Sequence, residues 1–584
     1  MQNPSTQNTK KRPRRFVILS VLFAAAVLIC AALALPKWGG RQPAQQTPAP
    51  SPVIYETGYL RSDGTAIAAY IITQDEQEGA RAVQVSELSR GTQVRYAQNA
   101  QIVDGLMPVL IGKAAYYVPR ESIVSDAQDV LAEQTLYMRT AQNLLCDPDT
   151  GMLGTLVAKG TQLTVTGYDQ MDDAGRVRMY RVQFTDSSGT QQEGYVRPWY
   201  VTADAQEALR AYDEAGVGAI HASRPDRYGG GDGAGLDYYP RQKGDFSDNV
   251  MPQECRTLYL CCYKSVLADV DSYIALADGC GINAFVVDIS DGAAIGYASP
   301  LMQEVSPTSY AAAQNSVEEY AAAIEKLRNA GYYVIGRITT FNDTCFVTDH
   351  PECGILDAAG APIQLQGNFW PSAYNRATWQ YKVALAREAV ELFGFDEIQF
   401  DYVRFPDGTY RHEQAGTINY QNAYGETKAQ AIQRFLMYAC DELHEMGVYV
   451  SADVFGETSN DYVAAYGQYW PAISNVVDVI SAMPYPDHYG ASGSYKPWEH
   501  PYETLSIWAA GAVQRQSETP TPAVVRTWIQ AYDAIRAPYT TYGPEQVGAQ
   551  IRAIRDAGIT GGYMTWNGSS NLWKYTSLQS AFNL

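Results

Sequence analysis

Carboxylates stand at the ends of two apolar runs in the C-terminal half of the chain. The run "FDEIQFDYVRFP" (395–406) starts as a buried strand and ends with an acid, Asp401, an aromatic and an Arg. The run "VSADVFGE" (450–457) ends with Asp453 and Glu457. Charged residues at the end of a strand are unfavourable unless they are solvated or paired. Two neighbouring carboxyl groups can cleave a glycosidic bond, because one attacks or activates water while the other protonates the leaving oxygen.

The elements that must position these residues alternate between strand and helix from residue 255 to the end. Helical stretches such as 316–331 and 429–447 close with Gly, as helices commonly do. The strand candidates are 256–263, 282–290, 332–341, 395–403, 448–456, 477–485, 524–532 and 561–567. Eight strands, each followed by a helix or a long connection, predict an α/β fold with a closed (β/α)₈ TIM barrel. An open doubly wound sheet is the alternative, and it would be expected to show a Gly-rich turn after the first strand, which "CCYKSVLAD" (261–269) lacks.

Strand alternation predicts which side chains enter the barrel. Gln399 and Asp401 share one face of their strand, as Ser451 and Asp453 share one face of theirs. Polar faces of this kind do not suit the exterior that packs against helices. We therefore expect the carboxylates of Asp401 and Asp453 to meet near the barrel axis, at the carboxyl ends of the strands.

Roles follow from this placement. We expect Asp401 to be catalytic, kept ionised by Arg337 or Arg404, while a less solvated Asp453 or Glu457 stays protonated. Further residues at the strand ends are expected to bind substrate or to support those that do, with Trp370 and Trp566 as sugar-stacking platforms; a purely structural role is the alternative for each. This set comprises Asp288, Arg337, Trp370, Tyr402, Arg404, Tyr485, Asp487, His488, Gln530 and Trp566.

Composition narrows the function further. A length of 584 residues implies several domains. A net charge of −20 disfavours nucleic acid as a partner. The 43 Tyr and 10 Trp residues suit sugar rings, although many of them must lie in strands and cores. The six His residues form no HxxxH or HExxH pair, so we expect no metal or other cofactor, and a metal-dependent deacetylase is disfavoured.

The N-terminus predicts a membrane anchor. A basic tail, 1–15, ends in "KKRPRR" and precedes an apolar stretch, 16–35, long enough to span a bilayer. The basic side stays in the cytoplasm, so the bulk of the chain is expected outside it. A cleaved signal peptide, giving a secreted protein, is the alternative. The Pro/Gln-rich segment 36–52 is predicted to be a linker.

Residues 53–128 and 129–203 are predicted to be two β-rich modules, because short alternating runs are separated by turn residues. The two share a Gly-Thr-Gln before an alternating strand and a later Tyr-Val, and they resemble bacterial Src-homology-3-like modules. The resemblance implies binding to the cell wall, and a spacer without ligand is the alternative. A helix and a Gly-rich loop, 204–254, are expected to connect them to the barrel at 255–584.

Four motifs occur in order at the expected strand ends: "FDEIQFDYVRFP", "VSADVFGE", "ISAMPYPDHY" (480–489) and "GYMTWN" (562–567). Together they resemble the glycoside hydrolase domain of bacterial envelope proteins, a group of TIM-barrel glycosidase relatives. The resemblance covers 255–584 and implies a (β/α)₈ fold that acts on a polysaccharide. It maps the nucleophile to Asp401 and leaves the acid open between Asp453, Glu457 and Asp487.

These observations predict a membrane-anchored, extracytoplasmic glycoside hydrolase. Its expected substrate is a cell-envelope or extracellular polysaccharide, including a peptidoglycan-type polymer, and a retaining mechanism is preferred. The alternative is a non-catalytic glycan- or wall-binding protein whose barrel keeps the groove without turnover.

Overall fold

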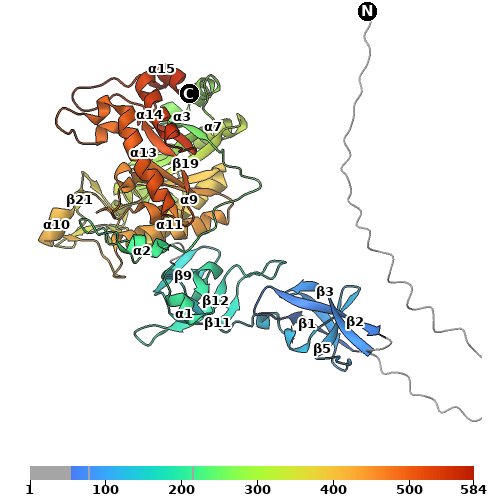
Figure 1. The fold of residues 1–584 in the computed structure, drawn as a ribbon. Coiled ribbons are helices and arrows are strands. Elements are labelled where there is room, and N and C mark those ends of the chain that lie inside the picture. Colours follow the sequence, from blue (N-terminus) through green and yellow to red (C-terminus); the bar gives the residue numbers. More distant parts are fainter. Residues whose placement is uncertain (1–53, 76–78, 213–215) are drawn as a thin grey trace, which may run out of the picture. The chain divides into compact units, whose positions relative to one another are not determined.

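The computed structural model describes residues 54–75, 79–212 and 216–584 (Figure 1). The described residues from Glu56 to Leu584 belong to one compact unit. The predicted basic tail, anchor and linker lie outside the described residues. Within the described ranges, no helix combines the length and the apolar character needed to cross a bilayer.

Two seven-stranded, all-β sheets come first along the chain. The strands of the first are β1 Tyr55–Leu60, β2 Ala66–Asp75, β3 Gly79–Ser89, β4 Gln93–Ala97, β5 Leu106–Ile111, β6 Ala114–Pro119 and β7 Ile123–Val124. Those of the second are β8 Thr135–Met138, β9 Gln142–Asp147, β10 Met152–Val157, β11 Gln162–Tyr168, β12 Tyr180–Thr185, β13 Gln191–Val196 and β14 Val201–Thr202. Their spatial orders, β3-β2-β6-β5-β4-β1-β7 and β10-β9-β13-β12-β11-β8-β14, are the same order shifted by seven strands. The similarity seen in the sequence is therefore a repeat of topology, while the Src-homology-3-like resemblance stays a prediction.

A buried ionic contact ties the second sheet to the domain that follows. Arg197, at the end of β13, is almost fully buried, and its Nη2 lies 2.8 Å from Oε1 of Glu442 on helix α11 (Lys428–His444). The same guanidinium also pairs with Asp441 and Glu445. Removing one partner would leave a buried charge unpaired, which is unfavourable. This contact therefore holds the second sheet against helix α11.

The C-terminal domain is a nearly closed parallel barrel. Its strands are β15 Cys255–Leu260, β16 Ala284–Asp291, β19 Tyr333–Thr339, β23 Glu397–Asp401, β25 Tyr449–Phe455, β26 Val479–Met483, β27 Val524–Val525, β28 Thr527–Gln530 and β29 Gly562–Trp566. They run in the order β27-β26-β25-β23-β19-β16-β15-β29-β28. The predicted parallel barrel is confirmed in this form. The predicted seventh strand, 524–532, is present as two segments, because β27 pairs with β26 and β28 pairs with β29 on either side of Arg526.

Helices and short strands fill the connections. The helices are α1 Ala205–Leu209, α2 Val217–Ala222, α3 Lys264–Leu267, α4 Val270–Asp278, α5 Pro300–Val305, α6 Pro307–Ala311, α7 Val317–Asn329, α8 Thr344–Asp349, α9 Arg376–Phe393, α10 Tyr410–Ala415, α11, α12 Trp470–Ser474, α13 Pro501–Ser517, α14 Pro544–Asp556 and α15 Leu572–Phe582. The short strands are β17 Ala294–Tyr297, β18 Ala313–Asn315, β20 Leu356–Asp357, β21 Gln364–Leu365, β22 Asn368–Phe369 and β24 Ile418–Asn419. Both α7 and α11 begin with a capping box, from Ser316 and Thr427, which satisfies their free amide groups.

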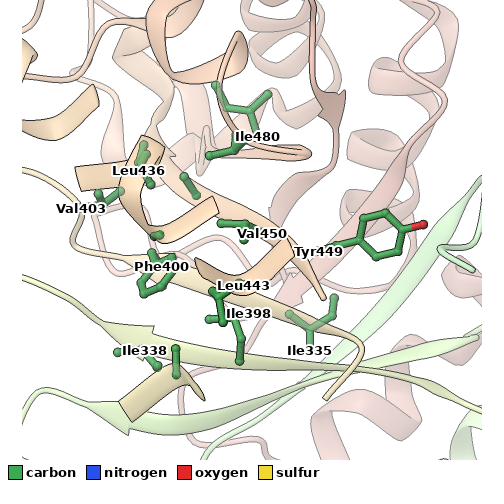
Figure 2. Packing of buried hydrophobic residues seen from close by; sticks show 14 of the residues in the cluster. Ile335, Ile338, Ile398, Phe400, Val403, Leu436, Leu443, Tyr449, Val450 and Ile480 are labelled. Atoms are coloured by element: carbon green, nitrogen blue, oxygen red, sulfur yellow. The ribbon is translucent and has the colours of Figure 1, made fainter. Parts of the chain in front are cut away.

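Strand β23 shows how alternation divides the barrel wall. Ile398 and Phe400 point outward and pack with Leu436 and Leu443 of α11 (Figure 2). Gln399 points inward, since its Nε2 lies 3.4 Å from Ser481 Oγ on β26 and 3.4 Å from Met564 Sδ on β29. Glu397 and Asp401 lie two positions before and after Gln399, so they also point inward, one near each end of the barrel.

A buried ion pair closes the lower, N-terminal end of the barrel. Arg526, between β27 and β28, donates from Nη1 to both oxygens of Glu397 at 2.8 and 3.0 Å, and neither side chain is exposed. Tyr333 on β19 adds a third hydrogen bond to Glu397 at 3.0 Å. The pair therefore joins the fourth strand to the split seventh strand across the axis.

We expect Arg526→Met to lower the free energy of unfolding of the barrel domain by about 3–5 kcal/mol, because it leaves the Glu397 carboxylate buried without its cation. The combined Arg526→Met/Glu397→Leu variant should recover much of that loss, since both charges are then absent. Calorimetric unfolding of the full chain measures the barrel transition for both variants. Equal stability of the single variant and the wild type would contradict this role.

Candidate active site

One guanidinium binds four carboxylates at the upper, C-terminal end of the barrel. Arg337 on β19 lies 2.6 Å from Asp288 of β16 and 2.6 Å from Asp401 of β23. It also lies 3.3 Å from Asp291 and 3.8 Å from Asp453 of β25. Since these strands are neighbours in the parallel barrel, the acids that end them converge on one point, as alternation predicts.

The neighbouring carboxylates keep Arg337 positively charged. Its side chain is 2% exposed. Burial alone would lower its pKa, but the carboxylates, led by Asp288 and then Asp401, outweigh burial and hold the pKa well above its ordinary value. Arg337 is therefore a permanent cation that orients the acids around it.

Asp288 is the most enclosed of the four acids. Its Oδ2 accepts a hydrogen bond from the hydroxyl of Tyr259 on β15, and its Oδ1 accepts one from Arg337. Burial raises the pKa of Asp288 to about 7, although Arg337 opposes the rise. Both oxygens are thus committed to protein groups.

Asp453 is buried, and only one of its two carboxyl oxygens is hydrogen-bonded to a described residue. Its Oδ1 accepts a hydrogen bond of 2.8 Å from Nε1 of Trp528 on β28. Its Oδ2 is buried and finds no hydrogen-bond partner among the described residues. Burial, followed by the charge of Asp401, raises its pKa well above the ordinary value. A protonated carboxyl is the form that this environment favours.

Asp401 sits where strand β23 ends in a strained turn. Its Oδ1 accepts from the backbone amide of Tyr402 at 2.5 Å, while its Oδ2 accepts from Arg337. Tyr402 has φ of 50°, a left-handed conformation that costs a residue other than Gly about 1–3 kcal/mol and is common at functional sites. The turn therefore holds Asp401 in one orientation.

The separation of Asp401 and Asp453 follows from their shared contact. Nε of Arg337 lies 3.2 Å from Oδ2 of Asp401 and 3.8 Å from Oδ2 of Asp453. The two oxygens are therefore at most about 7 Å apart, a limit that is compatible with the spacing of catalytic carboxyl pairs in glycosidases.

A cavity of about 350 Å³ is lined by Trp199, Tyr239 and α11, away from this cluster, whereas a cavity of about 210 Å³ opens directly above Arg337. The residues that line the second cavity are Asp291, Arg337, Asp401, Tyr402, Arg404, Phe455, Met483, Tyr485, His488, Trp528 and Trp566. Aromatic walls with a few convergent polar groups are typical of a small-molecule site.

The cavity gathers seven of the predicted site residues: Arg337, Asp401, Tyr402, Arg404, Tyr485, His488 and Trp566. Arg404 lies over the rings of Phe455, at 4.4 Å, and Tyr402, at 5.0 Å, so its guanidinium forms part of the wall. Burial raises the pKa of Tyr485 well above its ordinary value and lowers that of His488. Asp288 and Asp453 lie beneath the cavity without lining it.

Glu457 is not brought into the cavity. Strand β25 ends at Phe455, and Glu457 is an exposed residue of the turn Gly456–Ser459. Its two oxygens accept hydrogen bonds from the hydroxyls of Tyr462, at 2.6 Å, and Tyr466, at 2.9 Å. The chain turns away from the axis before Glu457, so the geometry gives no support to this residue as the partner acid.

Asp487 and Gln530 belong to a buried network beside the cavity. Asp487 accepts hydrogen bonds from the hydroxyl of Tyr532 at 2.8 Å and from Nε2 of Gln530 at 3.3 Å. The side-chain amide of Gln550 on α14 in turn forms two hydrogen bonds with the backbone of Gln530. This network fixes the turn Pro486–His488 and so places His488 at the cavity wall.

Trp370 is fully buried, contrary to the prediction of a stacking platform. Its Nε1 donates to the carbonyl of Leu365 at 3.1 Å, and Arg404 lies 5.0 Å above its ring. The ring of Trp370 is covered by protein and supports Arg404 from below, whereas Trp566 is partly exposed and lines the cavity.

Sequence reasoning missed Asp291, Tyr259, Trp528, Phe455 and Met483. Asp291 follows Asp288 by three residues in "VVDISDG", where a second acid beyond the strand end was the available signal. Among the described residues, no group of His, Cys, Asp and Glu is arranged as a metal site.

The fold and the site together define a class of protein. A parallel barrel with carboxylates at the carboxyl ends of its strands is an architecture used by glycosidases. Residues 257–572, more than half of the chain, match the family described as "Putative glycosyl hydrolase domain". The chain therefore belongs to this glycosyl hydrolase family.

Solved structures also show similarity. A hypothetical protein from Ruminiclostridium thermocellum is 33% identical over 34% of this chain and 97% of its own, with a TM-score of 0.28. The PgaB (BpsB) glycoside hydrolase domain from Bordetella bronchiseptica is 11% identical over 56% of this chain and 99% of its own, with a TM-score of 0.39. The spore cortex-lytic enzyme SleL from Bacillus megaterium is 10% identical over 56% and 74%, with a TM-score of 0.34. The search of curated proteins gave no match.

We expect Asp453→Asn to stabilise the protein at neutral and alkaline pH. The folded state holds the Asp453 proton more tightly than the unfolded state does. The contribution of Asp453 to the free energy of unfolding is therefore largest below its ordinary pKa, and it is lost as the pH rises toward the folded-state pKa. Asn cannot ionise and can keep the bond from Trp528. The advantage of the variant should grow by about 1.4 kcal/mol per pH unit within that window.

Thermal unfolding of both proteins from pH 4 to pH 9 measures this difference. The two curves should converge at the acid end, where Asp453 is protonated in both states. A variant that is less stable than the wild type by the same amount at every pH would show that the pKa of Asp453 is not raised in the folded state.

Proposed function

We propose that this protein is a glycoside hydrolase that cleaves glycosidic bonds of a cell-envelope or extracellular polysaccharide. One observation carries the proposal: Asp401 lines an aromatic cavity at the barrel mouth and is held there by Arg337, which further carboxyl groups also contact. Membership of the glycosyl hydrolase family supports it.

In this proposal Asp401 acts on the anomeric carbon of the sugar. Three hydrogen bonds, two from Arg337 and one from the Tyr402 amide, fix its carboxylate before substrate binds. A group that is already oriented needs no rearrangement as the bond forms, which lowers the barrier. Asp401 is the predicted nucleophile, and its position in the cavity is consistent with that role.

Asp453 and Asp288 keep the charge around Asp401 in balance. Burial raises the pKa of both carboxyls and so opposes further negative charge beside Asp401, which keeps its contact with Arg337. Asp453 does not line the cavity and therefore acts through Asp401 and Arg337. The sequence prediction of Asp453 as a group in contact with substrate is modified accordingly.

The aromatic side chains of the cavity suit the faces of a sugar ring. Trp566 is partly exposed and packs edge-on against Trp528 at 5.6 Å and beside Tyr259 at 4.6 Å, so its ring is held rigidly. Tyr402 and Tyr485 line the same space. We propose that Trp566 stacks on the sugar, since planar aromatic surfaces with nearby hydrogen-bonding groups bind such amphipathic rings.

A non-catalytic glycan-binding role is the second candidate, and one observation favours it. Every carboxylate of the cluster contacts Arg337, and acids that are locked in ion pairs can serve structure alone. Such a protein would bind the polysaccharide through the same aromatic cavity and release no product.

We expect Asp401→Asn to abolish hydrolysis with little effect on folding, because the amide keeps the shape of the carboxylate but cannot attack. The loss should be about 10²–10⁴-fold, the usual size for removal of a reacting carboxyl group. Incubation of the full chain with peptidoglycan, capsular polysaccharides and soluble glycans, followed by a reducing-end assay, provides the measurement. Glu457→Gln makes the same chemical change outside the cavity and should keep activity.

Product from the wild type and equal product from Asp401→Asn would remove Asp401 from the mechanism. Binding of a glycan by the wild type without product would establish the second candidate instead.

The location of the protein is also a proposal. The basic tail and apolar stretch of residues 1–35 support a single-pass membrane anchor that leaves the barrel outside the cytoplasm. The two β-sheets between anchor and barrel are proposed to bind the cell wall.

We expect the full chain to fractionate with membranes and to resist extraction by high salt, and a chain lacking residues 1–35 to be soluble, because a spanning helix is held by hydrophobic burial that salt does not weaken. Protease added to intact cells should digest the barrel domain. A soluble, shortened mature protein beginning near residue 36 would instead establish the signal-peptide alternative.

A further inference from the structure

Two carboxylates line the cavity, and the sequence predicted only one of them. Asp401 is one; the other is Asp291, whose side chain is 40% exposed. Its Oδ1 lies 3.3 Å from both terminal nitrogens of Arg337. No hydrogen bond to its Oδ2 is found among the described residues. Asp291 can therefore meet a substrate that enters the cavity while one oxygen stays anchored.

The backbone holds Asp291 rigidly for an exposed residue. It is the last residue of β16 and pairs with Ala294 in the antiparallel hairpin of β16 and β17. Gly292 has φ of 59°, which a turn of this tightness requires, and its amide donates to Oγ1 of Thr339 at 3.0 Å. The hairpin thus carries the carboxylate beyond Asp288 and over the mouth of the barrel.

The distance between the two cavity carboxylates is bounded by Arg337. Its Nη2 lies 2.6 Å from Oδ2 of Asp401 and 3.3 Å from Oδ1 of Asp291. Those oxygens are therefore at most about 6 Å apart, a limit that is compatible with the spacing in retaining glycosidases, in which one carboxyl is the nucleophile and the other the acid and base.

The other acids of the cluster suit the proton-donor role less well. Asp453 and Asp288 have fully buried side chains and do not line the cavity. Asp288 has both oxygens occupied, by Tyr259 and Arg337. A proton donor must reach the leaving oxygen and exchange protons with water, and within this cluster Asp291 meets both conditions alongside Asp401.

We infer that Asp291 is the general acid and base of the reaction, with Asp401 as the nucleophile; this inference rests on the proposed hydrolase function. In the first step an Asp401 oxygen bonds to the anomeric carbon, the glycosidic C–O bond breaks, and the Asp291 carboxylic acid gives its proton to the leaving oxygen. In the second step the Asp291 carboxylate takes a proton from water, the water oxygen bonds to the anomeric carbon, and the bond to Asp401 breaks. Both side chains end as they began.

The test compares natural and activated substrates. We expect Asp291→Asn to cut hydrolysis of the responsive glycan by about 10²–10⁴-fold, because its leaving oxygen needs a proton. The matching 2,4-dinitrophenyl glycoside has a leaving group that departs unprotonated, so the glycosylation step should stay close to the wild-type rate, as a burst of dinitrophenol. Sodium azide should then restore turnover and give a glycosyl azide, since azide attacks without a base.

Asp407→Asn is the matched control. Asp407 is 43% exposed and pairs with a second cavity arginine, Arg404, at 3.2 Å, yet it does not line the cavity. Loss of this exposed pair should cost less than about fivefold on either substrate. Melting temperatures of both variants check that each folds.

Each outcome decides one point. Equal loss on the glycan and on the dinitrophenyl glycoside, without azide rescue, would overturn the acid and base role of Asp291. So would a loss no larger than that of Asp407→Asn. If the wild type is active, Asp401→Asn is inactive and Asp291→Asn is active, this inference fails while the proposed function stands. If the wild type hydrolyses neither class of substrate, the proposed function fails and the inference fails with it.

Discussion

The site depends on one guanidinium at the barrel axis that is shared by more acids than it can neutralise. Arg337 contacts Asp288, Asp291, Asp401 and Asp453 from strands on either side of its own. One positive charge cannot compensate four negative charges in a buried place. Protonation relieves the excess. Burial favours the protonated form most clearly at Asp453, whose pKa rises well above its ordinary value, and it also raises the pKa of Asp288, to about 7.

This selection divides the cluster into two layers with different chemistry. The lower acids, Asp288 and Asp453, are buried beneath the cavity and accept hydrogen bonds from Tyr259 and Trp528. The upper acids, Asp291 and Asp401, share the cation and face the cavity. Their ordering comes from short backbone devices, a hairpin with Gly292 and a left-handed turn at Tyr402, and strain of this kind is usual where a fold fixes reactive groups.

From the sequence, the only residues of the upper site that could be predicted are those placed by the alternation of side chains along a strand. Alternation within β23 and β25 sends Asp401 and Asp453 inward, and parallel strands bring them to Arg337, so these three could be placed from pattern alone. Glu457 was misplaced because the pattern does not show that the strand ends at Phe455. Trp370 was misplaced because burial of an aromatic ring depends on distant segments. Asp291 was missed because a hairpin, not strand parity, returns it to the mouth.

The opposite end of the barrel shows what a structural ion pair looks like in the same fold. Glu397 and Arg526 are fully buried, match one charge with one charge, and receive a further hydrogen bond from Tyr333. A layer of uncharged side chains, including Gln399 and Ser481, separates this pair from the Arg337 cluster. Since stability alone is served by a balanced pair, an arrangement with surplus acid and an open cavity is better explained by chemistry at the barrel mouth than by folding.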